Sequence, residues 1–286
     1  MTSKVFIPAD VPQGAHAQYC KNYQAITYEN GRLFLFAADQ KIEHLNSDFA
    51  GKTIPKSVNN PKHLFEIAQQ GSIGAFATHL GLIARYGPDY SDINYIVKLN
   101  GKTNIVPTTQ RDPLSTQLWS VDDVITFQKS SGLKVRGIGY TVYLGSEYES
   151  VMLTQAAQTI ISAHRHGLVA ILWVYPRGKA VKEDRSDALI SGATGVAAAL
   201  GADFVKINPP RSGHKALKTA VHAAGMTKVI CTGGHKIPTR SFLKQLNEQL
   251  TKGNTFGCAV GRNIFSHELP RAIDITYKIA ELLKTR

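Results

Sequence analysis

The chain is poor in cysteine, and its three cysteines do not form a pattern that predicts a disulfide or a metal site. Cys20, Cys231 and Cys258 are odd in number and far apart, and the last two lie in apolar runs. Disulfide-rich secreted domains carry even numbers of closely spaced cysteines, so this pattern indicates a reducing compartment and buried thiols. We therefore expect a cytoplasmic protein.

Long apolar runs are also missing. No window approaches the roughly 20 apolar residues that a membrane-spanning helix needs, and the first ten residues, MTSKVFIPAD, lack the apolar core of a signal peptide. No low-complexity linker divides the 286 residues. We expect no membrane partner and a single domain over residues 1–286, in which residues 1–31 form an N-terminal extension with a leading helix.

The ten histidines do not cluster at the spacing of metal ligands, and no H-E-x-x-H motif is present. A metal-dependent mechanism is therefore disfavoured, and no metal or other cofactor is expected. Glu43 and His44 could face a site at the end of the first strand, but we expect solvent-exposed roles for both.

The net charge of +12 has two explanations. It could mark an anionic ligand such as a phosphate ester or nucleic acid, or it could be a solvated surface. The lysines are scattered and never form a run longer than two, which favours the surface for most of them. No helix-turn-helix, zinc knuckle or aromatic-basic pattern supports nucleic-acid binding, so no nucleic-acid partner is expected.

Eight short apolar segments alternate with helical patterns along the chain. The predicted strands are 32–39, 73–78, 94–99, 135–143, 168–175, 202–207, 228–232 and 256–260. Capping boxes at Ser120 with Asp123 and at Ser146 with Glu149 predict two of the helix starts. Strands separated by helices pair in parallel, and eight such units over about 250 residues match a closed (β/α)₈ (TIM) barrel of the α/β class. A doubly wound open sheet is the alternative, but no G-x-G-x-x-G follows the first strand.

Lys206 stands out because it lies in the middle of an apolar strand, in the stretch GADFVKINPP. A buried lysine is costly unless it is paired or becomes a neutral amine. A neutral amine is a nucleophile that can attack a ketone or an aldehyde. The alternative is a lysine that reaches out from the strand end to a carboxylate, and this strand alone does not decide between the two.

Other polar residues fall at the ends of the predicted strands, where barrels of this type gather their catalytic groups. Asp39 ends the first strand, Lys98 and Asn100 the third, and Tyr175 the fifth. Each has a bland explanation, such as a turn cap for Asp39 or an interface aromatic for Tyr175. Their shared position at one end of the barrel favours a site.

The segments TGGHK and GRN, after the seventh and eighth strands, predict a phosphate site. Gly233, Gly234 and Gly261 would let backbone N–H groups approach an anion. Lys236 and Arg262 would add charge. Barrels of this type commonly bind phosphate after these two strands.

Several segments together resemble the archaeal-type class I fructose-bisphosphate aldolases. They are FAADQKIEH, IVKLNGKT, WVYPRGK, GADFVKINPP, TGGHK and FGCAVGRNIF, and the similarity spans about residue 32 to the C-terminus. The resemblance implies a (β/α)₈ barrel, a metal-free aldolase acting on a phosphorylated sugar, and a homo-oligomer, often of ten chains.

The resemblance also implies roles for individual residues. Lys206 would form the Schiff base, Tyr175 would transfer protons, Asp39 would orient the substrate, and Trp173 would form a wall of the site. In addition to these implied roles, we expect Lys98 and Arg177 to bind substrate. Members of the family usually carry D-H-G after the first strand, whereas here Asp39 is followed by Gln40 and Lys41. The loop that frames the substrate therefore differs, and this bears on the identity of the sugar more than on the iminium chemistry.

The expected activity is cleavage or formation of a carbon–carbon bond in a phosphorylated ketose, with fructose 1,6-bisphosphate as the expected substrate. Tyr175 and Lys206 both need a lowered pKa at neutral pH, and desolvation and the nearby cations Lys98 and Arg262 could lower both. Two alternatives remain. One is a related Schiff-base synthase or thiolase, and the other is a non-catalytic barrel that binds phosphate ligands or nucleic acid.

Overall fold

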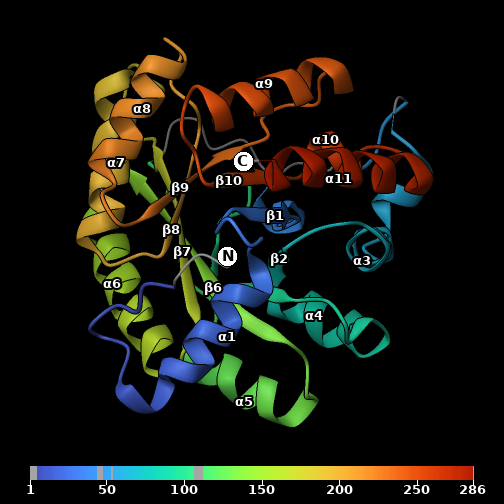
Figure 1. Cartoon of the computed structure of the whole chain (residues 1–286), viewed down its shortest axis with the longest axis horizontal. Coiled ribbons are helices and arrows are strands. Elements are labelled where there is room, and N and C mark those ends of the chain that lie inside the picture. Colours follow the sequence, from blue (N-terminus) through green and yellow to red (C-terminus); the bar gives the residue numbers. More distant parts are fainter. Residues whose placement is uncertain (1–4, 44–47, 53, 106–111, 286) are drawn as a thin grey trace.

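The computed structural model describes residues 5–43, 48–52, 54–105 and 112–285. Its centre is a closed parallel barrel in the order β1-β10-β9-β8-β7-β6-β3-β2 (Figure 1). All eight predicted strands are confirmed, and closure of the sheet rules out the open alternative. The strands are β1 (Leu33–Ala37), β2 (Ala75–His79), β3 (Tyr95–Lys98), β6 (Val135–Leu144), β7 (Val169–Pro176), β8 (Phe204–Ile207), β9 (Lys228–Thr232) and β10 (Gly257–Val260).

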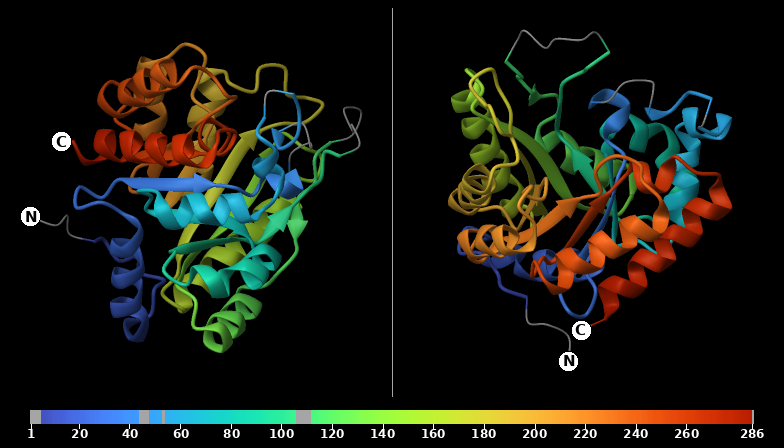
Figure 2. Two further views of the ribbon diagram at one scale, coloured as in Figure 1. Left: turned by 90° about the vertical axis from the view of Figure 1, so that its right-hand side faces the viewer. Right: turned by 90° about the horizontal axis from the view of Figure 1, so that it is seen from above.

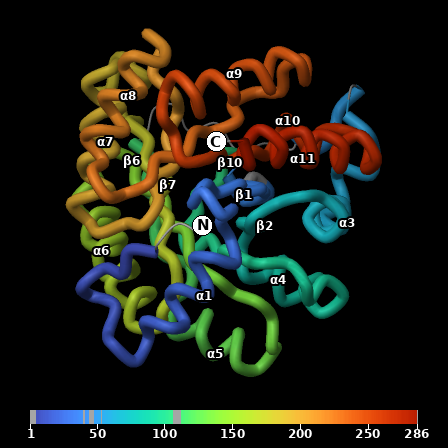
Figure 3. The backbone as a smooth tube through the Cα atoms, viewed as in Figure 1, coloured from blue at the N-terminus to red at the C-terminus, as the bar shows by residue number. Residues whose placement is uncertain are grey.

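Helices surround the barrel, and the tube in Figure 3 follows the alternation of inner strands and outer helices. The main helices that follow β2 in the chain are α4 (Leu80–Tyr86), α5 (Val121–Ser131), α6 (Glu149–Arg165), α7 (Asp187–Ala199), α8 (His214–Ala223), α9 (Thr239–Thr251) and α11 (Leu269–Lys284). The β1–β2 connection contains α2 (Gln40–Glu43), a 3₁₀ turn (Lys56–Asn59) and α3 (Lys62–Gln70), and a short α10 (Arg262–Phe265) follows β10. None of the helices in the described ranges is long and apolar enough to cross a bilayer.

One of the two predicted capping boxes forms. The Ser120 side chain accepts a hydrogen bond from the Asp123 N–H, and the Asp123 carboxylate accepts one from the Ser120 N–H, at the start of α5. The box predicted at Ser146 does not form. The Ser146 hydroxyl donates to Pro113 O instead (2.7 Å), and the Glu149 carboxylate accepts from the Gly145 N–H.

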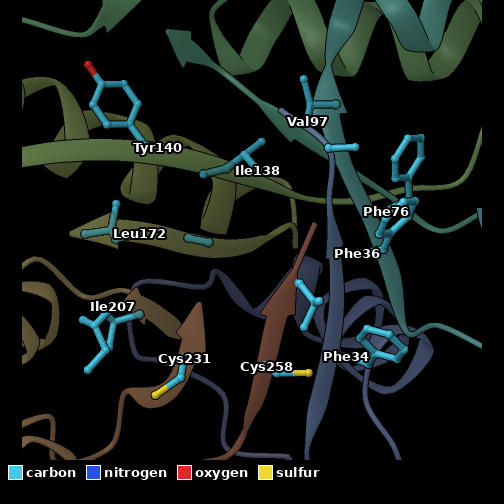
Figure 4. Packing of buried hydrophobic residues seen from close by; sticks show 14 of the residues in the cluster. Phe34, Phe36, Phe76, Val97, Ile138, Tyr140, Leu172, Ile207, Cys231 and Cys258 are labelled. Carbon is cyan, nitrogen blue, oxygen red and sulfur yellow. The ribbon is translucent and has the colours of Figure 1, made fainter. Parts of the chain in front are cut away.

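The barrel strands alternate between two apolar cores. Leu33 and Leu35 point into the barrel, where they join a small interior cluster with Trp173 and Phe204. Residues at alternate positions of the strands point outward and pack between the sheet and the helices. Figure 4 shows part of this outer cluster, including Phe34, Phe36, Cys231 and Cys258. Burial raises the pKa of the Cys231 thiol to about 12, so this side chain is an inert part of the core. This agrees with the expected buried thiols.

The end of the barrel at which the strands begin is closed by α1 (His16–Ile26), which follows a short 3₁₀ turn (Gln13–Ala15). The ring of Tyr23 stacks on Phe204 with 5.4 Å between ring centres, and the Tyr19 hydroxyl donates to the Asp203 carboxylate at the base of β8. Both chain termini lie on the same side of the molecule (Figure 2). With this end filled, the C-terminal ends of the strands are left for a site.

The connection after β3 contains a structure that the sequence did not predict. A two-stranded antiparallel hairpin forms between β4 (Asn100–Gly101) and β5 (Thr116–Gln117). The side chain of Asn100, at the start of this hairpin, forms hydrogen bonds with the backbone of β6.

Candidate active site

A cavity of about 1130 Å³ opens over the C-terminal ends of the strands. Nine of the predicted site residues line it: Asp39, Trp173, Tyr175, Arg177, Lys206, Gly233, Gly234, Gly261 and Arg262. Lys98 and Lys236 are not among the lining residues. The barrel therefore gathers most of the predicted residues from β1, β7, β8, β9 and β10 into one space.

Lys206 lies near the end of β8 and is only 6% exposed. Burial lowers the pKa of its amine; Asp39 and Glu43 oppose this effect, and Lys98 and Arg262 add to it. Among the described residues the structure shows no ion pair for Lys206. This environment favours the nucleophilic neutral amine over the paired lysine that was the alternative.

The indole ring of Trp173 forms the wall beside Lys206. The two residues are register partners on β7 and β8, and the ammonium nitrogen lies 5.0 Å from the ring centre. The ring fits because residue 139 on β6 is glycine: a Cβ there would lie 2.2 Å from an indole carbon. Any side chain at Gly139 would push Trp173 out of its position.

Tyr175 follows Trp173 by two residues on β7, so both side chains point into the barrel mouth. Burial raises the pKa of Tyr175 well above its usual value, and the charges of Asp39 and Glu43 raise it further. The expectation that desolvation would lower this pKa is therefore wrong. Desolvation disfavours the charged form, which for a phenol is the deprotonated one, so Tyr175 is a neutral proton donor at neutral pH.

Lys98 lies near Trp173, with its ammonium nitrogen 5.7 Å from the ring centre, but does not line the cavity. Its side chain is fully buried, and its ammonium group donates to Glu43 Oε1 (2.9 Å), Asn100 O (2.7 Å) and Asn100 Oδ1 (2.8 Å). An ammonium group has three N–H bonds, and all three have partners inside the protein. This contradicts the prediction that Lys98 contacts substrate.

Glu43 was expected to be solvent-exposed, and this is wrong. Its side chain is 10% exposed, lines the cavity and pairs with Lys98. Nothing local in the sequence singles out Glu43, because its partner lies 55 residues away. His44 lies outside the described residues.

The loop after β9 and the start of α10 form the predicted phosphate region. Gly234 has a left-handed backbone (φ 69°), and the Asn263 side chain holds the loop by donating to Gly233 O (2.7 Å) and His235 O (3.0 Å). The Arg262 guanidinium donates to His235 Nδ1 (3.1 Å) and lies 3.7 Å from an oxygen of Asp48. His235 and Asp48 also line the cavity and were not predicted individually.

Lys236 points elsewhere. Its ammonium group donates to Ser266 O (2.8 Å), at the end of α10, so it ties the loop to the helix rather than facing the cavity. Arg177, in contrast, lines the cavity and is exposed, with its guanidinium carbon 5.6 Å from the ring centre of Tyr143. In the barrel order β6 lies opposite β10, and Arg177 N–H donates to Leu144 O at the end of β6. Arg177 follows β7 and Arg262 follows β10, three strands away in the barrel order, so the two guanidinium groups come from different parts of the cavity rim.

The described part of the chain contains no group of three or more His, Cys, Asp or Glu residues arranged to hold a metal ion. His79 lies close enough to Lys98 for the two groups to interact. Burial, followed by the charge of Lys98, lowers its pKa to about 4, so this ring is neutral at neutral pH.

Comparison with known proteins gives a consistent result. A family model described as DeoC/LacD family aldolase matches residues 33–267. A fructose-bisphosphate aldolase/6-deoxy-5-ketofructose 1-phosphate synthase of Methanocaldococcus jannaschii is 52% identical over 94% of this chain and 87% of its own length.

Solved structures show the same similarity. The fructose-bisphosphate aldolase of Slackia heliotrinireducens has a TM-score of 0.95 and 46% identity, over 99% of this chain and 91% of the other. An archaeal fructose-1,6-bisphosphate aldolase, solved with its catalytic lysine covalently bound to the carbinolamine intermediate of the substrate, has a TM-score of 0.81 and 27% identity, over 93% of this chain and 100% of the other.

Proposed function

The chain belongs to the DeoC/LacD aldolase family, and we propose that it cleaves and forms fructose 1,6-bisphosphate through a Schiff base on Lys206. The observation that carries this proposal is the environment of Lys206, a buried amine with a lowered pKa on the wall of a large cavity. Relatives and structural neighbours named as fructose-bisphosphate aldolases support the substrate.

The first step joins the amine to the substrate ketone. The lone pair of the Lys206 amine attacks C2, and the carbonyl oxygen becomes the hydroxyl of a carbinolamine. Loss of this hydroxyl as water, with a proton supplied from the site, leaves an iminium cation. Tyr175 is suited to supply that proton because its raised pKa keeps the phenol protonated.

The second step breaks the C3–C4 bond. The C4 hydroxyl loses its proton to a base, its electrons form the aldehyde carbonyl, and the C3–C4 electron pair moves towards the iminium nitrogen to give an enamine. The tyrosinate left by the first proton transfer, or Asp39 on the opposite wall, would accept this proton. Protonation of the enamine at C3 and hydrolysis then release dihydroxyacetone phosphate.

The two ends of the cavity suit a substrate with two phosphates. The glycine loop with Arg262 would hold the phosphate nearer the iminium, and Arg177 would meet the other from a different part of the cavity rim. Lys102, whose pKa is lowered by burial and by the charge of Arg177, adds a second cation near Arg177. Guanidinium groups bind phosphate oxygens through paired N–H donors, which supports both assignments.

A second candidate reaction is synthesis of 6-deoxy-5-ketofructose 1-phosphate, the other activity in the name of the Methanocaldococcus jannaschii relative. This compound carries one phosphate and no C6 oxygen. It would use the same lysine and the same glycine loop and would make no use of Arg177. Comparison of both reactions in one Arg177→Gln preparation separates them.

We infer in addition a cytoplasmic homo-oligomer, as expected from the sequence, with a decamer as the expected form. Free cysteines support the reducing compartment. Two exposed apolar side chains, Tyr148 at the N-cap of α6 and Val151 on α6, support a contact between copies. Light scattering coupled to size-exclusion chromatography measures the number of chains.

The test of the main proposal is covalent trapping. Dihydroxyacetone phosphate and borohydride should add one reduced adduct per chain by intact mass, and peptide mapping should locate it on Lys206. The Lys206→Met variant should take up none. An adduct on Lys98, or labelling of Lys206→Met to the same extent, would contradict the assignment.

A further inference from the structure

The buried ion pair between Glu43 and Lys98 lies at the edge of the site, with Glu43 lining the cavity and Lys98 close to the Trp173 ring, and it has no role in the proposed chemistry so far. We propose that Glu43 is a positioning residue that neutralises Lys98, so that the indole ring beside the Schiff-base lysine contacts a charge-compensated pair. This inference rests on the proposed function, because it concerns the amine and iminium of Lys206.

The pair is held rigidly. The Lys98 ammonium is fixed by Glu43 Oε1 and by both oxygens of Asn100. Asn100 is itself clamped, since its amide group donates to Ser115 O (3.0 Å) and Thr141 O (2.8 Å) and its Oδ1 accepts from the Thr141 N–H (2.8 Å). Every polar group of the cluster made of Lys98 and Asn100 is therefore satisfied, and the cation cannot turn towards the cavity.

Trp173 connects this cluster to the reacting amine. Its ring centre lies 5.7 Å from the Lys98 nitrogen and 5.0 Å from the Lys206 nitrogen. The Trp173 side chain is 1% exposed, so little water separates the two nitrogen atoms to screen their interaction. Both nitrogen atoms thus lie close to one aromatic ring, and the charge on Lys98 acts on Lys206 in these dry surroundings.

Several charged or titratable groups face this region, and their effects differ in sign. Asp39 and Glu43 raise the pKa of Lys206, whereas Lys98 and Arg262 lower it. The groups that face the Glu43–Lys98 pair from neighbouring elements are His79, Lys102, Tyr143 and Tyr175. Of the carboxylates, Glu43 is the one that forms an ion pair with Lys98 in the described structure.

Removal of one partner has a definite consequence. Without the Glu43 charge, Lys98 becomes an unpaired buried cation beside the site where a second permanent cation, the iminium, must form. Formation of the iminium then becomes less favourable, and protonation of the Lys206 amine is disfavoured for the same reason. Without Lys98, the unpaired Glu43 charge acts in the opposite direction.

The experiment measures the pH dependence of trapping of dihydroxyacetone phosphate by cyanoborohydride in the full-length chain. The acid limb is the part of the pH profile in which the trapping rate rises as the Lys206 amine loses its proton. In Glu43→Gln this limb should move to lower pH by about one unit, and trapping at pH 8 should fall about tenfold, the factor that corresponds to one pKa unit. In Lys98→Met the limb should move to higher pH. In the double variant Glu43→Gln/Lys98→Met it should return towards the wild-type position, with part of the lost rate restored.

Glu66→Gln is the matched control, since it breaks the exposed ion pair between Lys62 and Glu66 (3.5 Å) far from the cavity. It should leave both the limb and the rate unchanged. If Glu43→Gln fails to fold in a thermal melt, Lys98→Met and the double variant carry the test, because the acid limb should move to higher pH in the first and return in the second.

Single variants that lose rate with unmoved limbs, or a double variant no better than Glu43→Gln, would overturn the inference and leave Glu43 a merely structural residue. Absence of any adduct on Lys206 in the wild-type protein would instead contradict the proposed function itself.

Discussion

Trp173 and Lys206 are register partners on adjacent strands, and the amine of Lys206 lies 5.0 Å from the centre of the indole ring. An aromatic face excludes water from one side of the amine and offers no hydrogen-bond acceptor to its charged form beyond the weak attraction of the ring. The site therefore lowers the pKa of Lys206 mainly through burial. Three predictions concern the site around this pair, and a fourth concerns the opposite end of the barrel.

The first concerns the space that Trp173 occupies. Gly139→Ala places a methyl group 2.2 Å from an indole carbon, so the ring must move from its observed position beside Lys206. We expect kcat/KM for fructose 1,6-bisphosphate to fall by about 10² or more, since small misplacements in a site are costly. Gly192→Ala in α7, where a Cβ meets nothing within 4 Å, is the control and should keep full activity. Equal activity of the two variants would show that Trp173 does not need its observed position.

The second separates iminium formation from cleavage. Tyr175→Phe removes the phenol hydroxyl and keeps the ring. Trapping on Lys206 should persist in part, whereas cleavage should fall by about 10² or more, the usual size of a general acid–base contribution. Stopped-flow measurement of cleavage beside a trapping assay gives both quantities. A wild-type cleavage rate would move the proton transfer to another group, and Asp39 is the next candidate.

The third compares the two arginines of the cavity rim. Arg177→Gln should lower kcat/KM for fructose 1,6-bisphosphate by about a hundredfold and leave fructose 1-phosphate nearly unaffected, because a charge-assisted bond to phosphate contributes a few kcal/mol. Arg262→Gln should weaken both phosphorylated substrates and spare their dephosphorylated analogue. If Arg177→Gln reduces the two substrates equally, its guanidinium does not hold the second phosphate.

The fourth concerns stability at the opposite end of the barrel. His164 lies between Asp203 (3.2 Å) and Asp10 (2.8 Å). Burial alone lowers the pKa of His164, but the hydrogen bonds and charges of Asp203 and Asp10 outweigh burial and raise it to about 9. The folded pKa thus exceeds the unfolded value of about 6.5, so the protonated ring stabilises the fold fully below pH 6.5 and loses this effect as the pH rises through 9.

His164→Gln should therefore lower the free energy of unfolding near pH 6 by on the order of 3 kcal/mol and much less near pH 10. Urea denaturation of both proteins at the two pH values measures the difference. His222→Gln on the exposed face of α8 is the control and should show no pH-dependent difference. A deficit of equal size at both pH values would mean that the ring contributes through packing and not through its charge.

Features that depend on neighbouring residues in the chain were predictable from the sequence. Apolar runs, helix caps and glycines at helix ends are local, so all eight strands and the closed barrel followed from them. Lys206 was conspicuous for the same reason, since a cation interrupts an apolar strand. Parallel strands in a closed barrel end on one side, and this is why Asp39, Tyr175 and Arg262 could be assigned to one cavity before any distance was known.

Tertiary structure alone decided which of these side chains face the cavity. Lys98 and Lys236 also lie at or after the ends of strands, yet neither faces the cavity. The ammonium group of Lys98 is bound by Glu43 and Asn100, and that of Lys236 donates to the carbonyl oxygen of Ser266. The capping box at Ser146 does not form for a similar reason, because the Ser146 hydroxyl donates its hydrogen bond to the carbonyl oxygen of Pro113, 33 residues earlier.

The sequence therefore determined the barrel, the lysine within an apolar strand and the glycine loops at the C-terminal ends of the strands, because each depends on local pattern and on the common direction of parallel strands. It could not determine the electrostatics of the site. The pKa of Tyr175, the space beside Gly139 and the partner of Lys98 depend on burial and on contacts between segments far apart in the chain, 55 residues in the case of Lys98 and Glu43. Desolvation and pairing are properties of the packed interior, and they exist only once the barrel has closed.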